Sequence, residues 1–289
     1  MSEQLTAEQK LEQLIATKKI VALGGGEKRI EAQHAKGKLS ARERIDLLLD
    51  PGSFDEIDTL MRPRSGGATS AGEAVVTGWG KVEGRPVFVF SYDFTLLGGS
   101  LSEAVAEKIL KVMDLSMTTG APIIGIIDSG GARIQDGPEA LRGFGEIFAM
   151  NTLASGVVPQ ISVIMGPGAG GGAYSPAITD FIFMTKKSSY MFLTGPDVIK
   201  TVTHEDVTME ELGGAVTHST KSGVCHFAGD DEKTTLLLIR ELLGYLPSNN
   251  VEDVPIVRTN DPATRIENKL RTLIPENTKQ AYDSKELVE

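Results

Sequence analysis

The stretches APIIGIIDSGGAR (residues 121–133) and VVPQISVIMGPGAGGGAYSP (residues 157–176) decide the fold of this chain. Each begins with a short apolar run, typical of a buried strand, and ends in several glycines. The segment between them, GPEALRGFGEIFAMNTLAS (residues 137–155), has the spacing of a helix. Strands that alternate with helices of this length predict an α/β protein with a largely parallel sheet and right-handed crossovers.

Further elements follow on both sides of this pair. Strands are predicted at residues 54–58, 73–82 and 86–92, and helices at residues 100–120 and 231–246, and a further apolar run lies at residues 180–184. The strands at 73–82 and 86–92 are separated by a turn at Glu83-Gly84, so they are predicted to form a β-hairpin.

The two ends of the chain differ from this central region. Residues 1–52 carry leucine and isoleucine at spacings of three and four, which predicts a helical arm. The triplet Gly24-Gly25-Gly26 divides the arm into two helices, and Asp50-Pro51-Gly52 ends the second. Residues 53–246 are predicted to be the main domain, and residues 247–289, rich in Pro, Asn and Asp, a linker or C-terminal arm.

Charge and composition exclude several classes of function. The chain has 29 basic and 39 acidic residues, a net charge of −10, which disfavours nucleic acid and anionic membranes as partners. No apolar segment is long enough to insert in a membrane and no targeting pattern is visible, so a cytoplasmic location is expected. Cys225 is the single cysteine and the four histidines are scattered, so no metal site is expected.

The two glycine-rich turns, at residues 128–133 and 166–176, are the candidate site. The carboxyl ends of parallel strands face one edge of a sheet, so the turns are expected side by side across a crevice. Glycine lets a ligand approach the backbone closely, and two amides that converge on one oxygen form an oxyanion hole. The alternative is that these glycines serve only tight turns and close packing of helices.

The glycine turns allow two other interpretations. Gly166, Gly168 and Gly171 match the dinucleotide pattern GxGxxG, but Pro176 and the apolar run at 180–184 leave too short a helix for it. Ser129 and Ser175 could be nucleophiles of a serine hydrolase. Neither has a histidine close in sequence, although His34 or His204 could supply a partner.

At these residues the chain resembles the carboxyltransferase (β) subunits of biotin-dependent acyl-CoA carboxylases, of the propionyl-CoA carboxylase type. The segments that carry the resemblance are DSGGARIQDG (128–137), residues 155–181, TGPDVIK (194–200), ELGGA (211–215), residues 37–58 and DFTLLGGSLSE (93–103). Related decarboxylase and transcarboxylase subunits share these motifs, and the similarity covers almost the whole chain.

The resemblance implies a crotonase-like fold of the ClpP/crotonase type, built from ββα units, with acyl-CoA in a crevice at the glycine turns. It implies carboxyl transfer from carboxybiotin, borne by a partner carrier domain, to a short acyl-CoA, most plausibly propionyl-CoA. The oxygen of the thioester enolate would be held by backbone amides, so no side-chain base is required.

The family's site residues map onto the two turns. The resemblance makes Gly131 and Ala132 of the first turn, and Gly170 and Gly171 of the second, the candidate oxyanion residues, with the choice inside each pair left open. The candidate substrate-binding residues are Gly130, Arg133, Gly172, Ala173, Arg42 and Ser100. For Arg42 and Ser100 the alternatives are a solvated helix face and a helix N-cap respectively.

The chain departs from the family in three ways. It holds the first crotonase-like domain and the linker without the second domain; its segment 66–78 is shorter than usual; and Gly172 replaces a more usual alanine. The implied partners are acyl-CoA, a biotin carboxylase or biotin carrier subunit, a second carboxyltransferase domain and further copies of this chain. The alternatives are a methylmalonyl-CoA type decarboxylase or transcarboxylase subunit, another crotonase-like acyl-CoA enzyme, or a scaffold domain without activity.

Overall fold

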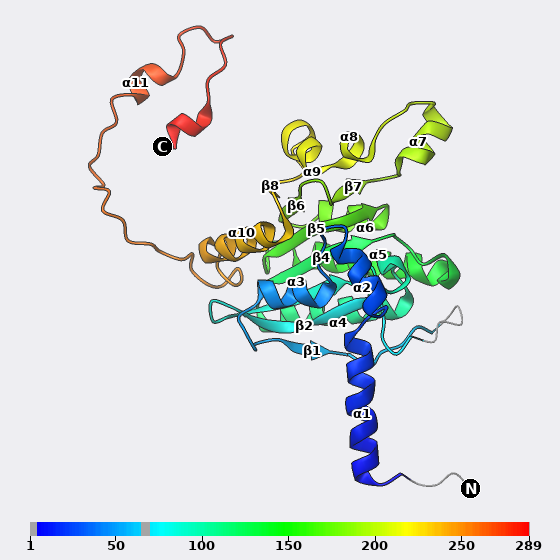
Figure 1. Cartoon of the computed structure of the whole chain (residues 1–289). Helices are drawn as coiled ribbons and strands as arrows, with labels where there is room; N and C mark the ends of the chain where they lie inside the picture. Colours follow the sequence, from blue (N-terminus) through cyan, green and yellow to red (C-terminus); the bar gives the residue numbers. More distant parts are fainter. Residues whose placement is uncertain (1–4, 65–69, 289) are drawn as a thin grey trace. The chain divides into compact units, whose positions relative to one another are not determined.

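The computed structural model describes residues 5–64 and 70–288 (Figure 1). The shortened segment 66–78 therefore lies partly outside the described residues. The chain divides into a main unit, Met1–Pro255, and a C-terminal unit, Ile256–Glu289. The C-terminal unit contains a short helix, α11 (Leu270–Leu273), and a 3₁₀ turn, Ser284–Leu287.

The main unit is built on one mixed sheet of eight strands. They are β1 (Asp55–Ile57), β2 (Val75–Val82), β3 (Arg85–Tyr92), β4 (Ile123–Ser129), β5 (Gln160–Ala169), β6 (Phe181–Thr185), β7 (Tyr190–Phe192) and β8 (Phe227–Gly229). The order is β1-β2-β3-β4-β5-β6-β8, and β7 pairs with the end of β5. The first three strands are antiparallel, whereas every pair from β3 onward is parallel, which confirms the predicted α/β class.

The predicted hairpin is formed by β2 and β3. Val82 pairs with Arg85, and both turn residues, Glu83 and Gly84, have positive φ values of 51° and 78°. A two-residue loop with positive φ at both positions matches the right-handed twist of the flanking strands. The hairpin and the helix that follows it form one ββα unit.

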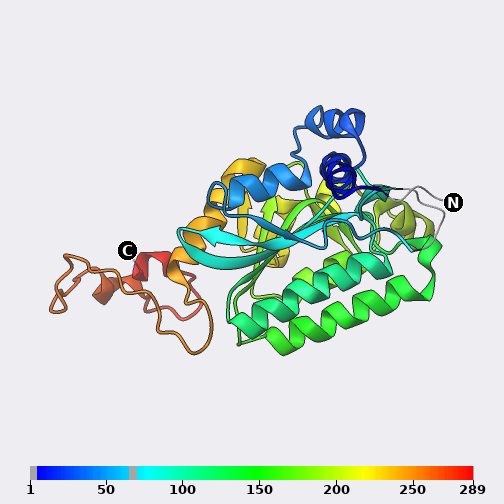
Figure 2. The same cartoon turned by 90° about the horizontal axis from the view of Figure 1, so that it is seen from below.

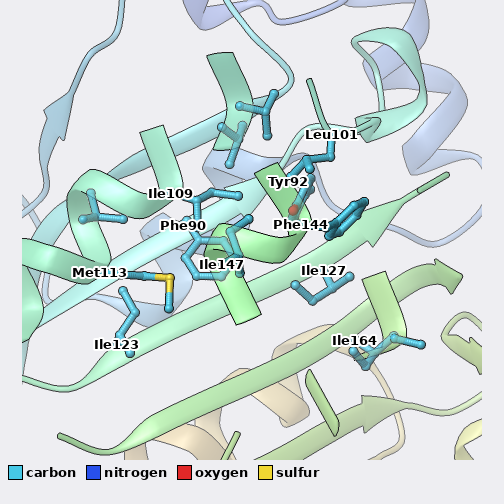
Figure 3. Packing of buried hydrophobic residues seen from close by; sticks show 14 of the residues in the cluster. Phe90, Tyr92, Leu101, Ile109, Met113, Ile123, Ile127, Phe144, Ile147 and Ile164 are labelled. Carbon is cyan, nitrogen blue, oxygen red and sulfur yellow. The ribbon is translucent and has the colours of Figure 1, made fainter. Parts of the chain in front are cut away.

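The helices of the main unit cover both faces of the sheet (Figure 2). Helices α4 (Glu103–Thr119) and α5 (Pro138–Ala154) pack on one face, in a core that includes Phe90, Ile123 and Phe144 (Figure 3). On the other face α3 (Ala41–Leu48) and α10 (Glu232–Tyr245) pack on residues such as Ile124 and Ile126. The remaining helices are α6 (Gly171–Ala177), α7 (Pro196–Thr203), α8 (Met209–Gly213) and α9 (Ala215–Thr217).

The N-terminal arm contains three helices where two were predicted. The glycine triplet does separate α1 (Ala7–Ala22) from α2 (Glu27–His34). The second predicted helix is wrong as a single element, because the chain turns at Gly37, which has φ of +73°, and restarts at Ser40. Ser40 and Glu43 form a reciprocal capping box that begins α3, a signal present in the sequence.

Candidate active site

The two glycine turns lie side by side, as predicted. Strands β4 and β5 are parallel neighbours, and Ser129 at the end of β4 is in register with Gly168 at the end of β5. A methyl group added at Gly131 would lie 3.6 Å from the carbonyl oxygen of Ala169. The two backbones therefore approach each other closely at the carboxyl edge of the sheet.

Three of the amides at these turns are already used inside the protein. The N–H of Gly130 donates to the Gly98 carbonyl at 2.9 Å, and that of Gly170 donates to the Phe192 carbonyl at 3.2 Å. The N–H of Gly131 donates to the hydroxyl of Ser129 at 3.1 Å. These bonds hold the turns in shape, and the three amides are not free to bind a ligand.

The amides of Ala132, Gly171 and Gly172 have no hydrogen-bond partner within residues 5–64 and 70–288. Ala132 and Gly171 are partly exposed, whereas Gly172 is buried. Gly171 and Gly172 are the first two residues of α6, where the helix dipole adds partial positive charge. The arrangement presents one free donor on the first turn and one on the start of α6, which can stabilise an oxyanion.

The segment around Leu101, just before α4, pairs with the first turn in the manner of a short parallel strand. Leu101 donates to the carbonyl of Gly131 and accepts from the N–H of Arg133, each at 2.8 Å. In a parallel ladder a residue flanked in this way directs its own N–H to the other side. The N–H of Ala132 therefore faces away from Leu101.

Arg133 and Ser100 lie together behind this turn. Arg133 is 4% exposed, its guanidinium pairs with Glu73, and it donates to the hydroxyl and carbonyl of Ser100 at 3.2 Å. The N-cap of α4 is Ser102, whose hydroxyl accepts from the N–H of Val105, so Ser100 does not serve as that cap. Arg133 and Ser100 thus support the turn through bonds to the protein itself.

Arg42 is not brought to the glycine turns. Its guanidinium forms a two-pronged ion pair with Glu56, at 2.7 and 2.9 Å. A double hydrogen bond of this kind fixes the orientation of both groups, and it links α3 to β1. Ala173 is placed at the site, since it is buried in the first turn of α6 and donates to the carbonyl of Gly170 at 2.8 Å.

The two serines do not have the partners of a hydrolase. Ser129 is 1% exposed and donates to the carbonyl of Gly99 at 2.6 Å, and Ser175 donates to Asn151 at 2.8 Å. In the described part of the chain no histidine bonds to either hydroxyl. A nucleophilic serine needs a base within hydrogen-bond reach, so the geometry disfavours hydrolysis.

A buried ionic cluster lies directly below the first turn, and sequence reasoning missed it. Asp128 is fully enclosed, and it bonds to Lys38 at 2.7 Å and Arg44 at 3.0 Å. Arg44 also pairs with Glu232 of α10 at 2.6 Å and donates to the Met165 carbonyl in the middle of β5. The cluster of Lys38, Arg44, Asp128 and Glu232 joins the arm, β4 and α10.

The charges of this cluster balance, with two cations against two anions. Burial lowers the pKa of the Lys38 ammonium, and the neighbouring Asp128 carboxylate opposes that shift. Burial alone would also lower the pKa of Arg44, but its hydrogen bonds and charge interactions with Glu232 and Asp128 raise it. Loss of any one member would leave an uncompensated charge in the interior.

An open groove adjoins the first turn. Its lining residues come from α2, from the turn that follows α2 and from the segment before α4, namely Arg29, Ala32, Gln33, Lys36, Phe94, Thr95, Leu97 and Gly98. The wall of the groove contacts the turn, since the Gly98 carbonyl accepts from the N–H of Gly130. Gln33 also donates to Asp128, so both walls connect to the end of β4.

We expect Gly172→Ala to leave the turn intact and to raise the free energy of unfolding by up to about 1 kcal/mol. The reason is that alanine stabilises a helix more than glycine does. A methyl group at Gly172 would meet nothing within 4 Å. At Gly171 it would lie 2.7 Å from the Phe144 ring, so Gly171→Ala should lower stability. Denaturant unfolding of the two variants checks this, and equal losses for both would contradict it.

Other classes of site find no support within the described ranges. No helix there is long and apolar enough to cross a membrane. No group of three or more His, Cys, Asp or Glu residues in the same ranges is placed to hold a metal ion. Helix α6 has only seven residues and contains Pro176. The glycines of the GxGxxG pattern are therefore not followed by the full helix that dinucleotide binding needs.

Comparison with known proteins supports the resemblance found in the sequence. Residues 32–289 match the family model described as the carboxyl transferase domain. The chain is 56% identical over 283 residues to a propionyl-CoA carboxylase beta chain of Roseobacter denitrificans, covering 96% of this chain and 56% of that protein. It is 54% identical over 288 residues to the methylmalonyl-CoA decarboxylase subunit alpha of Veillonella parvula, covering 98% and 57%.

Among solved structures, the chain is similar to transcarboxylase 12S determined with hydrolyzed methylmalonyl-coenzyme A bound. The TM-score is 0.91 and the identity 45%, over 100% of this chain and 58% of that one. This likeness confirms the carboxyltransferase fold, of crotonase-like type, that the sequence predicted. The chain spans a little more than half the length of the relatives that it matches.

Proposed function

This chain belongs to the carboxyl transferase domain family, and from that premise we propose that it is the acyl-CoA-binding half of a biotin-dependent carboxyltransferase. The proposed substrate is a short acyl-CoA, with propionyl-CoA preferred because the beta-chain relatives carry that name. The observation that carries the proposal is the pair of amides on adjacent turns, those of Ala132 and Gly171, that have no partner among the described residues.

These amides suit the chemistry of an enolate. Removal of a proton from the carbon beside a thioester moves negative charge onto the thioester oxygen, and the enolate carbon then attacks CO₂. Donors already aimed at that oxygen need not reorganise during the reaction, and each contributes about 3 kcal/mol to transition-state stabilisation. The N–H of Gly172, which follows in α6, is a third donor close by.

The donor set at the turns fits a cofactor that brings its own base. Asp128 and Arg133 are engaged in buried ion pairs, and the hydroxyl of Ser129 is bonded on both sides. No described carboxylate or imidazole at the two turns is thus left free to take the proton. Carboxybiotin, when bound, supplies both the CO₂ and the base, so the chain's own task is to bind and polarise the thioester.

We assign the groove beside the first turn to the CoA portion of the substrate. Arg29 and Lys36 give it positive charge for phosphate groups, and Phe94 offers an apolar face. Gly98 of the groove wall is bonded to Gly130 of the first turn, so we place the acyl end of a substrate bound in the groove near the Ala132 amide. Within this proposal Gly130, Gly131, Gly170, Arg133 and Ser100 shape the site, while Arg42 braces α3 against β1.

The partners are part of the same proposal. We propose that a second carboxyltransferase domain and a biotin carrier complete the active site, and that copies of the chain assemble together. Support for assembly comes from the hexamer named for transcarboxylase 12S. The decarboxylase relative favours the reverse half-reaction as a second candidate, because both directions use one enolate. A cytoplasmic location remains part of the proposal.

Calorimetric titration of the purified chain tests the function. We expect binding of propionyl-CoA and CoA but not NAD, and tighter binding of propionyl-CoA than of its propyl thioether, which lacks only the carbonyl oxygen. Carboxylation of propionyl-CoA by free carboxybiotin should be weak or absent until a complementing second domain is added. Binding of NAD, or failure to bind any CoA compound, would exclude the proposed site. Rapid carboxylation by the chain alone would exclude the proposal that a second domain is needed for the reaction.

A further inference from the structure

The wall of the groove and the first glycine turn are joined by an unbroken row of hydrogen bonds. The carbonyls of Gly98, Gly99 and Leu101 accept from Gly130, Ser129 and Arg133 in order, and Leu101 donates back to Gly131. A methyl group at Gly99 would lie 2.2 Å from the Asp128 carbonyl, so the two segments are in tight contact. We call this row of bonds the groove seam.

Among the described residues, Ser129 is the one side chain that bonds to both segments of the groove seam through a single atom. Its hydroxyl donates to the carbonyl of Gly99 at 2.6 Å and accepts from the N–H of Gly131 at 3.1 Å. It is 1% exposed, so water cannot replace either bond. The hydroxyl therefore fixes the direction of the Gly131 amide relative to the groove wall.

The direction of the Gly131 N–H influences the direction of the Ala132 N–H, which comes next in the chain. With the Gly131 N–H directed at Ser129, and Leu101 bonded on either side of Ala132, the Ala132 N–H is left facing the opposite side. Without the hydroxyl, the Gly131 peptide could rotate, since glycine tolerates both signs of φ and stands here at +97°. The Ala132 N–H belongs to the following peptide, whose Gly131 carbonyl is held by Leu101, so rotation at Gly131 would strain that bond and shift the Ala132 donor.

We propose that Ser129 is a positioning residue, whose hydroxyl sets the first glycine turn against the groove wall so that the Ala132 N–H faces the thioester oxygen of bound acyl-CoA. The inference rests on the proposed function. It gives Ser129 a role in the reaction that requires no nucleophilic attack, and it explains why a serine in a candidate active site is enclosed and doubly bonded.

The test compares Ser129→Ala with the wild-type chain by titration with propionyl-CoA and with its propyl thioether. The ratio of the two affinities measures what the carbonyl oxygen contributes. We expect this ratio to fall about tenfold in Ser129→Ala, equivalent to about 1.4 kcal/mol, while the affinity for the thioether stays unchanged.

Ser116→Ala is the matched control. Ser116 is equally buried and donates its hydroxyl to a backbone carbonyl, that of Ala121, away from both turns. It should cost similar stability and leave the ratio unchanged. An equal fall in both variants, or no fall in Ser129→Ala, overturns the inference. If the wild-type chain itself does not distinguish the two ligands, the proposed function fails and this inference with it.

Amide hydrogen exchange gives a readout that is independent of ligand. In the wild type the Gly131 N–H is held by Ser129 and should exchange slowly. In Ser129→Ala we expect its exchange to quicken at least tenfold, with exchange in α4 and α5 unaltered. Unchanged protection of Gly131 would show that the hydroxyl does not hold this amide, and would overturn the proposed role.

Discussion

Asp128→Asn should lower the free energy of unfolding of the main unit by about 3–5 kcal/mol, the usual cost of removing one partner from a buried ion pair. Asp128 is fully enclosed and neutralises Lys38 and Arg44 together with Glu232. The asparagine keeps the shape of the side chain but leaves one buried positive charge without a counterpart. The variant should therefore unfold at a much lower denaturant concentration.

Fluorescence of Trp79, the single tryptophan, reports this transition because it lies in β2 of the main unit. The control is Asp230→Asn, which breaks the exposed pair with Lys186 and should change stability by less than about 1 kcal/mol. Combining Asp128→Asn with Lys38→Met restores the charge balance and should recover part of the loss. Equal stability of Asp128→Asn and Asp230→Asn would mean that the cluster is not a structural requirement.

The second large effect is expected at the free amides. Ala132→Pro removes the N–H that the proposed mechanism uses but no hydrogen bond made within the described protein. In the chain complemented with a second domain and carboxybiotin, we expect kcat to fall about 100- to 1000-fold, the usual cost of losing one oxyanion donor. Because free CoA makes no use of that donor, its affinity should stay close to that of the wild type.

Ala132→Gly is the control for the first turn, since it keeps the N–H and removes only the methyl group. Gly171→Pro repeats the test on the second turn, at a helix position where proline is well tolerated. Its steric control is Gly171→Ala, because the Cβ atom of either proline or alanine at this position would crowd the Phe144 ring. If Ala132→Pro and Ala132→Gly have equal kcat, the Ala132 amide does not stabilise the enolate.

Much of the fold could be predicted because its signals are local. The apolar runs of β4 and β5, the capping residues of the helices and the turn at Glu83-Gly84 each act over a few neighbouring positions. The break between α2 and α3 was missed although Gly37 and the Ser40–Glu43 capping box mark it. The segments on both sides of Gly37 share one charged helical pattern, and that pattern predicts a single continuous helix.

The sequence by itself determined the α/β class, the hairpin, the pairing of two glycine turns at one sheet edge and the family resemblance. Only the tertiary structure decided which amides are free, because that depends on Gly98, Phe192 and Ser129 occupying the others. It alone revealed the cluster of Lys38, Arg44, Asp128 and Glu232, whose members lie far apart in the chain. Periodicity and turn chemistry are short-range, whereas hydrogen-bond partners and buried charge pairs exist only once distant segments have packed together.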